Sequence, residues 1–490
     1  MTEHKDLKIS KAIAAFRSIV GKEWVINESA AMAPYECDAL FHLCERPMAV
    51  VLPANEAEVC EVLRYCAEQR IAVTPRGAGT SLSGGATPVS NSVVIGLNRL
   101  RTISLLPAAC QVVVGPGVRN IVVSEFAEGD GLFFAPDPSS QSACTIGGNL
   151  AENAGGVHCI KYGLTVNNIF GARIIDGAGN ILELGGAALD TPGFDFLSLI
   201  TGSEGLLGLI TEARLRVLPL PTKVRVLLAF FSSTRKTCDA VTSIIGAGIV
   251  PAGLEVMDNA SLRAANRYSP GLQLRIDAGG ALLCELDGVP AEIESWTEQI
   301  KGIFEKHDLL EVRQADDQQE RLDLWSARKN ILPALLRTAR DVYVADCVVP
   351  RRLLGQVLDR INEMAEEASI EIVQSFHAGD GNLHSVLRYD SRNKGEEVRA
   401  MDLADRIMAL ALEVGGSISG EHGIGTEKLH GMCWQFGTDE LEVFSQIRQL
   451  FDPHSILNPG KAIPTLHRCA ELGGMHIHDG KMLHSDLPRF

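Results

Sequence analysis

Three dense glycine clusters constrain this chain more than any other feature of its sequence. They lie at residues 75–85, 144–163 and 201–208. Glycine lets a backbone approach a ligand closely, and successive backbone N–H groups in such a loop can hold a pyrophosphate. Taken alone, a loop of this kind is about as often a tight turn without a ligand as it is a ligand-binding loop. Three loops far apart in the sequence instead indicate a long ligand, such as a dinucleotide, that lies against several segments.

Several other classes of protein are disfavoured by motif and composition. Neither Gly-x-Gly-x-x-Gly nor the phosphate-loop pattern Gly-x-x-x-x-Gly-Lys-Ser/Thr occurs in the chain. The formal net charge of −16 argues against a nucleic-acid partner, which would need a basic surface. The 12 cysteines include no Cys-x-x-Cys pair, so an iron–sulfur cluster on this chain loses its main support. No apolar run is long enough to span a bilayer, and we expect a cytoplasmic protein.

The distribution of apolar residues predicts an α+β chain with three parts. Residues 48–52 are typical of a buried strand, and Asn55 is expected to cap a helix with Glu58 as its capping-box partner. Prolines at 219 and 221 mark a boundary, because this spacing breaks both helices and sheets. Beyond it, strands alternate with helices, which suits an antiparallel sheet covered by helices. We expect domains at 1–222, 223–425 and 426–490, the last consisting of helices and a tail.

Two short motifs in the second half of the chain carry metal-binding residue types. Residues 376–384 (FHAGDGNLH) place His377 and His384 on a glycine turn, and residues 419–425 (SGEHGIG) add Glu421. Two imidazoles and one carboxylate form a typical ligand set for a divalent cation, with an open position for a substrate. Because these residues lie in glycine-flanked loops, packing alone does not explain them. The sequence therefore predicts a metal site.

Other residues of the same motifs leave room for alternatives. Asp380 and Asn382 are either ligands themselves or groups that orient the histidine rings. His422 cannot easily share a metal with its neighbour Glu421 unless the backbone bends. A free imidazole beside a metal is a good general base, because its ordinary pKa of about 6.5 suits proton removal near neutral pH.

The glycine-rich segments resemble a known flavin-binding domain. Arg76-Gly-Ala-Gly-Thr-Ser-Leu, Thr145-Ile-Gly-Gly-Asn, Ala154-Gly-Gly and Gly202-Ser-Glu-Gly-Leu occur in the order found in the vanillyl-alcohol-oxidase and p-cresol-methylhydroxylase superfamily. The resemblance implies a two-lobed α+β FAD-binding domain and an antiparallel-sheet substrate domain, or cap, covered by helices. It implies that FAD is held by Arg76, Gly77, Ala78, Gly79, Thr80, Ser81, Pro136, Thr145, Gly148, Asn149, Ala154, Gly155, Tyr162, Glu204, Ile210 and Asn458. His158 is expected to be a polar wall residue, not a covalent attachment point.

The histidine motifs resemble those of one group in this superfamily, the FAD-linked 2-hydroxy-acid dehydrogenases. The resemblance implies one divalent metal (zinc, manganese or iron) with the ligands His377, His384 and Glu421. It also implies that His422 is the base and that Arg328 clamps the substrate carboxylate, with Arg76 and Arg337 as weaker candidates. In the implied reaction the metal lowers the pKa of the substrate hydroxyl, His422 takes the proton, and hydride passes from Cα to the flavin.

Residues 251–259, 283–288 and 328–330 and the tail at 463–471 carry a closer resemblance. They resemble members of this group that serve as the catalytic FAD subunit of a glycolate oxidase complex. This implies oxidation of glycolate to glyoxylate, with D-lactate to pyruvate as a further reaction. The implied partners are a second flavin-type subunit and an iron–sulfur subunit, which would place the chain at the inner membrane through its partners only. The tail is expected to dock partners and carries His467, His476, His478 and His484.

Three other functions remain open from the sequence. A D-lactate or D-2-hydroxyglutarate dehydrogenase of the same group would need more room and, for a second carboxylate, another cation. A non-catalytic flavin subunit would not need the two histidine motifs. An NADPH-dependent reductase on the same flavin fold would be reduced by NADPH.

Overall fold

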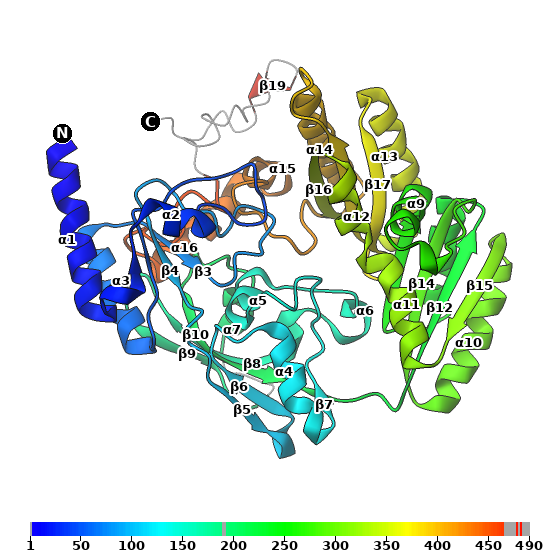
Figure 1. The fold of residues 1–490 in the computed structure, drawn as a ribbon, viewed down its shortest axis with the longest axis horizontal. Helices are drawn as coiled ribbons and strands as arrows, with labels where there is room; N and C mark the ends of the chain where they lie inside the picture. Colours follow the sequence, from blue (N-terminus) through cyan, green and yellow to red (C-terminus); the bar gives the residue numbers. More distant parts are fainter. Residues whose placement is uncertain (1, 189–192, 465–476, 479–480, 483–490) are drawn as a thin grey trace. The chain divides into compact units, whose positions relative to one another are not determined.

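The computed structural model describes residues 2–188, 193–464, 477–478 and 481–482 (Figure 1). The chain forms two compact units. The first comprises Met1–Ala154, Leu164–Pro219 and His422–Phe490, and the second comprises Gly155–Gly163 and Leu220–Glu421. The domain boundaries expected at 222 and 425 stay predictions, and the tail residues His467, His476 and His484 lie outside the described residues. No helix among the described residues is long and apolar enough to cross a membrane.

The first unit begins with a four-stranded sheet in the order β1-β2-β4-β3. Its strands are β1 (Val25–Ile26), β2 (Ala49–Val51), β3 (Val73–Arg76) and β4 (Val93–Gly96), of which the last three are parallel. Helices α1 (Thr2–Val20) and α3 (Glu56–Gln69) share its core, and the short α2 (Ser29–Met32) follows β1. Asn55 caps α3 by accepting a hydrogen bond from the Glu58 N–H at 3.0 Å, as the capping-box pattern predicts.

A five-stranded antiparallel sheet forms the second lobe of the first unit, in the order β5-β6-β10-β8-β9. Its strands are β5 (Ile103–Leu106), β6 (Gln111–Val114), β8 (Ile169–Ile175), β9 (Ile181–Gly185) and β10 (Leu209–Arg216). The helices of this lobe are α4 (Asn120–Ala127), α5 (Ile146–Glu152) and α7 (Phe196–Ile200), with β7 (Leu132–Phe133) paired to β11 (Leu218–Pro219). Helices α15 (Met432–Gln435) and α16 (Thr438–Phe451) follow near the C-terminus, and Phe451 packs into this core. The expected two-lobed architecture is confirmed.

The second unit is built on a seven-stranded sheet in which every neighbouring pair is antiparallel, in the order β15-β12-β14-β13-β17-β18-β16. The strands are β12 (Lys223–Phe231), β13 (Gly253–Asp258), β14 (Gly280–Gly288), β15 (Leu309–Ala315), β16 (Asp341–Val348), β17 (Glu371–His377) and β18 (Asn382–Tyr389). The helices are α6 (Cys159–Tyr162), α8 (Thr234–Gly246), α9 (Asn259–Tyr268), α10 (Pro290–Glu305), α11 (Gln318–Lys329), α12 (Ile331–Thr338), α13 (Leu354–Ala368) and α14 (Glu396–Glu413).

Helices cover both faces of this sheet, which explains the continuous apolar run at residues 226–231 of β12. In β12, Leu227 and Phe231 pack with α8, α10, α13 and α14, whereas Val226 and Phe230 pack with α9, α11 and α12. Successive side chains of a strand point to opposite faces, so a strand covered on both sides reads as a continuous apolar run. The antiparallel sheet covered by helices that the sequence predicts is confirmed.

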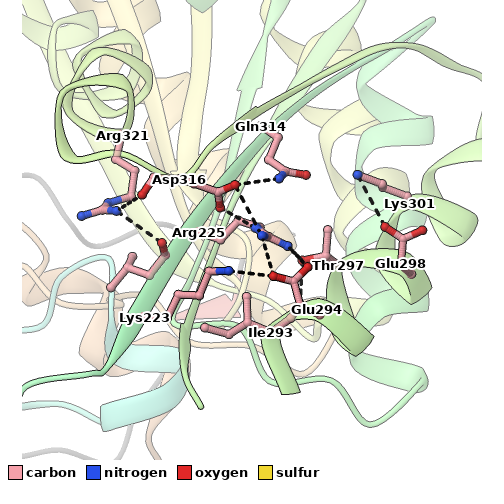
Figure 2. A network of polar contacts seen from close by, with 11 residues as sticks. Lys223, Arg225, Ile293, Glu294, Thr297, Glu298, Lys301, Gln314, Asp316 and Arg321 are labelled. Atoms are coloured by element: carbon pink, nitrogen blue, oxygen red, sulfur yellow. Dashed lines mark hydrogen bonds and ion pairs between the residues drawn. The ribbon is translucent and has the colours of Figure 1, made fainter. Parts of the chain in front are cut away.

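The edge of this sheet carries a dense polar network centred on Arg225 (Figure 2). The guanidinium group grips Glu294 of α10 with two hydrogen bonds of 2.8 and 2.9 Å, and its Nε donates to Asp316 at 2.6 Å. Arg225 also donates to Thr297 Oγ1 at 3.1 Å. Its side chain is only 5% exposed, so these contacts offset the cost of burying the charge. The network ties α10 and the end of β15 to β12.

Replacing Arg225 by methionine should therefore destabilise the protein while keeping much of the apolar stem. We expect a loss of about 1–3 kcal/mol, because two carboxylates and a hydroxyl lose their common donor. Thermal unfolding of the full-length chain, followed by circular dichroism, should show a melting temperature lower by several degrees. Lys301→Met in α10 is the control. It removes the ion pair between Lys301 and Glu298, whose charged atoms are 3.6 Å apart, and should change the melting temperature little, because that pair is exposed. Equal melting temperatures for the Arg225 variant and the native chain would contradict the structural role.

Candidate functional site

The glycine clusters of the first unit lie against one another. A Cβ atom built on Gly77 would lie 2.4 Å from Thr145 Oγ1, so the first cluster touches the second. A Cβ atom on Gly205, whose φ is +73°, would lie 3.0 Å from the Pro75 ring, which places the third cluster beside the start of the first. Only glycine permits this approach at Gly77, since any larger residue would collide with the threonine hydroxyl.

A segment from the end of the chain joins the clusters. The side-chain Nδ2 of Asn458 donates to the backbone carbonyls of Gly85 and Glu204 at 2.9 Å each. Lys461, which is 1% exposed, donates from Nζ to the Gly85 carbonyl at 2.8 Å and to the Thr87 carbonyl. Sequence positions more than 370 residues apart are thus held together by buried hydrogen bonds.

Buried polar atoms at this junction have unused hydrogen-bonding capacity. Among the described residues, Thr145 Oγ1 and Asn458 Oδ1 are buried and have no hydrogen-bond partner. Leaving a buried polar atom unsatisfied costs about 1–3 kcal/mol, so such atoms normally meet a ligand, an ion or a water molecule. Together with the close approach at Gly77, these atoms fit a polar ligand that lies along the glycine clusters.

Glu204 connects the third glycine cluster to the segment that follows His422. Its carboxylate oxygens accept hydrogen bonds from the backbone N–H groups of Ile424 and Gly425 at 2.7 Å each. A Cβ atom on Gly423 would lie 2.9 Å from Glu204 Oε1, so the backbone there passes directly over the carboxylate. Burial raises the pKa of Glu204, and the two N–H donors oppose that rise.

The remaining residues predicted to hold FAD in the first unit have varied surroundings. Arg76 is 6% exposed and donates to the carbonyls of Ala86 at 3.0 Å and Pro34 at 3.1 Å, so it supports the first cluster from within. The Pro136 carbonyl accepts from Asn120 at 3.0 Å. Ile210 packs in the core of the five-stranded sheet. The other first-unit positions predicted to hold FAD are Ala78, Gly79, Thr80, Ser81, Gly148, Asn149 and Ala154.

Gly155 and Tyr162 belong instead to the second unit, because acidic residues of β14 hold the segment 155–163 there. The hydroxyl of Tyr162 donates to Asp287, and His158 Nε2 lies 2.9 Å from Glu285 Oε1. Burial of the phenol and its hydrogen bond to Asp287 both raise the pKa of Tyr162. The local pattern does not reveal that the middle of a glycine cluster belongs to another unit, because the anchoring acids lie more than 120 residues away.

Three side chains of the second unit converge where β17 ends and β18 begins. Nε2 of His377 and Nε2 of His384 lie 3.3 and 3.4 Å from Glu421 Oε1. The two imidazole rings are 5.0 Å apart and nearly perpendicular. One ligand atom from each of the three residues lies within 4.8 Å of the other two. The structure thus brings together the three predicted metal ligands. Asp380 accepts from the Asn382 N–H at 3.1 Å and closes the turn between the strands.

Glu255 is a functional candidate that the sequence reasoning missed. It lies in β13 with no exposed surface, and its Oε1 accepts a hydrogen bond from His377 Nδ1 at 2.7 Å. Its Oε2 accepts from Arg328 Nε at 2.8 Å. A carboxylate on Nδ1 fixes the ring orientation and leaves Nε2 as the ligand atom, which is the common arrangement around metal-bound histidine. The signal available in the sequence was a lone acid in an apolar strand, which is costly unless partnered.

Asp346 plays a similar supporting part for Glu421. This fully buried residue of β16 accepts hydrogen bonds from Ser419 Oγ at 2.8 Å, Gly420 N at 2.9 Å and Glu421 N at 3.3 Å. A Cβ atom on Gly420 would lie 2.1 Å from Asn382 Oδ1, so the turn packs tightly against the β17–β18 connection. These contacts hold the turn that carries Glu421 and is followed directly by His422.

The electrostatics of the cluster favour a positive charge between its side chains. Burial of the ring lowers the pKa of His377, but the carboxylates of Glu255 and Glu421 outweigh burial and raise that pKa well above its usual range. The donor set of two imidazoles and one carboxylate is one that zinc, manganese and iron accept, so the residues fit a divalent cation.

Comparison with known proteins identifies the family. Residues 220–462 match the family of FAD linked oxidases, C-terminal domain, and residues 47–185 match the FAD binding domain family. The chain is 46% identical over 486 residues to glycolate oxidase subunit GlcD of Escherichia coli strain K12, covering 99% of this chain and 97% of the relative.

This chain belongs to the family of FAD-linked oxidases.

Two further relatives extend the comparison of this FAD-linked oxidase. It is 32% identical to a D-lactate dehydrogenase of Anaerostipes hadrus, covering 92% of this chain and 95% of the relative. The solved structure of p-cresol methylhydroxylase with substrate bound shares the fold, with a TM-score of 0.78 and 16% identity, covering 94% of this chain and 97% of the other. The fold expected from the resemblance to the vanillyl-alcohol-oxidase and p-cresol-methylhydroxylase superfamily is confirmed. FAD is the cofactor that the unpaired polar atoms of Thr145 and Asn458 fit.

Glu255→Gln in this FAD-linked oxidase should weaken binding of a divalent cation by about 10–100-fold, because the charge behind His377 is lost while the side-chain shape is kept. Metal titration of the cation-free protein would measure the affinity. Glu285→Gln is a matched control, since this residue is also a buried strand acid bonded to a histidine, but not to one of the cluster. An unchanged cation affinity in the Glu255 variant would contradict the supporting role of Glu255.

Proposed function

We propose that this FAD-linked oxidase oxidises glycolate to glyoxylate, with D-lactate to pyruvate as a second reaction. The observation that carries the proposal is the convergence of His377, His384 and Glu421 within 4.8 Å. A cation held by these three residues would supply Lewis acidity to the hydroxyl group of a 2-hydroxy acid. The 46% sequence identity to the glycolate oxidase subunit supports glycolate as the substrate. The similarity to a D-lactate dehydrogenase supports the second reaction.

The chain's own residues divide the work of this reaction. His377, His384 and Glu421 would hold the divalent cation, which supplies Lewis acidity that lowers the pKa of the substrate hydroxyl. His422, the next residue after Glu421, takes the hydroxyl proton on an imidazole nitrogen. Arg328 binds the substrate carboxylate, and Glu255 orients both Arg328 and His377. Bound FAD supplies the acceptor for the hydride that leaves Cα.

The proposal extends to partners that remove the electrons. The E. coli relative is named as a subunit, which supports membership in a multi-subunit complex. Since the sequence lacks Cys-x-x-Cys pairs, we propose that an iron–sulfur subunit and a second flavin-type subunit accept electrons from this chain. Contact with the inner membrane would then occur through these partners.

Anaerobic flavin bleaching tests the substrate assignment. The purified protein would be mixed separately with glycolate, D-lactate, D-2-hydroxyglutarate and NADPH, and flavin absorbance would be followed in a stopped-flow spectrometer. We expect fastest bleaching by glycolate, slower bleaching by D-lactate, and none by NADPH. If D-2-hydroxyglutarate bleached the flavin fastest, it would take the place of glycolate as the proposed substrate. If none of the three acids bleached the flavin, the result would favour a non-catalytic flavin subunit.

A further inference from the structure

A basic cavity lies in the second unit, away from His377, His384 and Glu421. It has a volume of about 330 Å³ and is lined by residues of α9, α12, β17 and β18. Glu371, at the start of β17, lines the cavity, whereas His377 ends the same strand. At about 3.3 Å per residue these two positions lie roughly 20 Å apart. The cavity is therefore separate from the candidate metal site.

Arginine dominates the charge of this cavity. Its lining includes Arg263 and Arg267 of α9, Arg337 of α12 and Arg388 of β18. Glu371 is the single acidic residue of the lining, and it is already paired with Arg388 at 2.5 Å. Within the described part of the chain, the other three arginines form no ion pair. In a protein with a net charge of −16, this local excess of positive charge runs against the composition.

Arg263, Arg267 and Arg337 are exposed residues, so without an anion their like charges repel one another only weakly. Arg263 and Arg267 are one helical turn apart on α9, so their like charges repel each other. Helices α9 and α12 pack against each other, and Arg337 of α12 lines the same cavity. A bound anion would remove this repulsion and form charge-assisted hydrogen bonds with several guanidinium groups.

Two of these guanidinium groups are already held in place. Arg263 Nε donates to Asn259 Oδ1 at 2.7 Å, and the Arg337 guanidinium lies 4.4 Å from the centre of the Tyr268 ring. A planar guanidinium that is fixed before binding loses less freedom when it meets a carboxylate or phosphate. The arrangement is therefore organised in advance for an anion with more than one charged group.

The rest of the lining leaves room for a carbon skeleton. The side chains of Ala260, Ala264 and Ala334 are small, and Val373 adds an apolar surface. Cavities of about 300–1,000 Å³ are typical of small-molecule sites, which places this one at the small end of that range.

We propose that this cavity binds a small organic anion that carries at least two carboxylate or phosphate groups. The proposal does not depend on the oxidation reaction, because it concerns a site at the other end of β17.

Equilibrium dialysis of the full-length holoenzyme tests the proposal with two probes, radiolabelled citrate and radiolabelled pyrophosphate, in about 0.15 M salt to screen weak surface attraction. We expect saturable binding of one equivalent of at least one probe. Saturation by citrate alone indicates a carboxylate ligand, and saturation by pyrophosphate alone indicates a phosphate ligand. Binding of neither probe at concentrations up to about 1 mM would overturn the proposal, since an affinity below that range provides little specificity.

Paired variants locate the site. Arg263→Ala combined with Arg267→Ala should weaken probe binding by at least about tenfold, because two charge-assisted donors are lost. Arg352→Ala combined with Lys394→Ala removes the same charge from exposed positions outside the cavity and should leave binding unchanged. Flavin absorbance and the melting temperature should be native in both variants, which shows that they fold. Equal probe binding by the native protein and both paired variants would overturn the proposal. Binding of the protein to phosphatidylglycerol vesicles, with no binding of either small probe, would also overturn it.

Discussion

Replacing His422 by alanine should lower the rate of flavin reduction by glycolate by about 10²–10⁴-fold and leave FAD bound. The physical reason is that the substrate hydroxyl must lose its proton as hydride leaves Cα, and His422 is the imidazole next to the predicted metal ligand Glu421. The hydrogen bonds from Ile424 and Gly425 to Glu204 hold the backbone just beyond it. Anaerobic stopped-flow measurement of flavin absorbance gives the rate of this single step directly.

The control for this variant is a histidine of the same unit that lies outside the motifs. His454→Ala should bleach with glycolate at the native rate. The flavin-to-protein absorbance ratio of each purified variant reports whether FAD is retained. If the His422 variant were reduced at the native rate, His422 would not be the base. If it lost FAD, the residue would act in cofactor binding instead.

Removing the divalent cation should have a comparably large effect. Dialysis against a chelator, or the substitution His384→Ala, should slow flavin reduction by about 10³-fold or more, since a Lewis acid on the substrate hydroxyl supplies several kcal/mol of stabilisation. Adding zinc, manganese or iron separately to the chelated native protein should restore the rate with one of them and so identify the metal. The readout is the same anaerobic bleaching, together with elemental analysis of the bound cation.

The acid–base state of the cluster makes this prediction sharper. Because Glu255 and Glu421 raise the pKa of His377 well above its usual range, a proton competes with the cation for that imidazole near neutral pH. The affinity for the cation should therefore rise with pH, by about tenfold per unit while one proton is displaced. His307→Ala, which removes an imidazole bonded to Ser243 elsewhere in the second unit, should leave rate and affinity unchanged. Full activity after complete removal of the metal would contradict the proposed chemistry.

Local sequence was sufficient for the parts of the protein whose signal is local. The Asn55–Glu58 capping box marks the start of α3, and both apolar faces of β12 are visible as one continuous run. The three glycine clusters and the two histidine motifs could be recognised because each is a short run of neighbouring residues. A backbone that approaches a ligand closely requires glycine at several successive positions, and the histidines lie within such glycine-rich turns. The α+β class followed from the residue pattern, whereas the FAD-linked family was recognised through the resemblance of these segments to known proteins.

Tertiary structure decided what depends on residues distant in the chain. Glu255 reaches His377 across 122 positions and Arg328 across 73, and Asp346 holds the Glu421 turn from a different strand. Residues 155–163 join the second unit because β14 supplies their anchoring acids. Arg337, a weaker candidate for the substrate clamp, lies in the basic cavity with three other arginines. The sequence position of an acid or an arginine does not reveal its partner, because its charge is paired with a side chain that tertiary packing brings beside it.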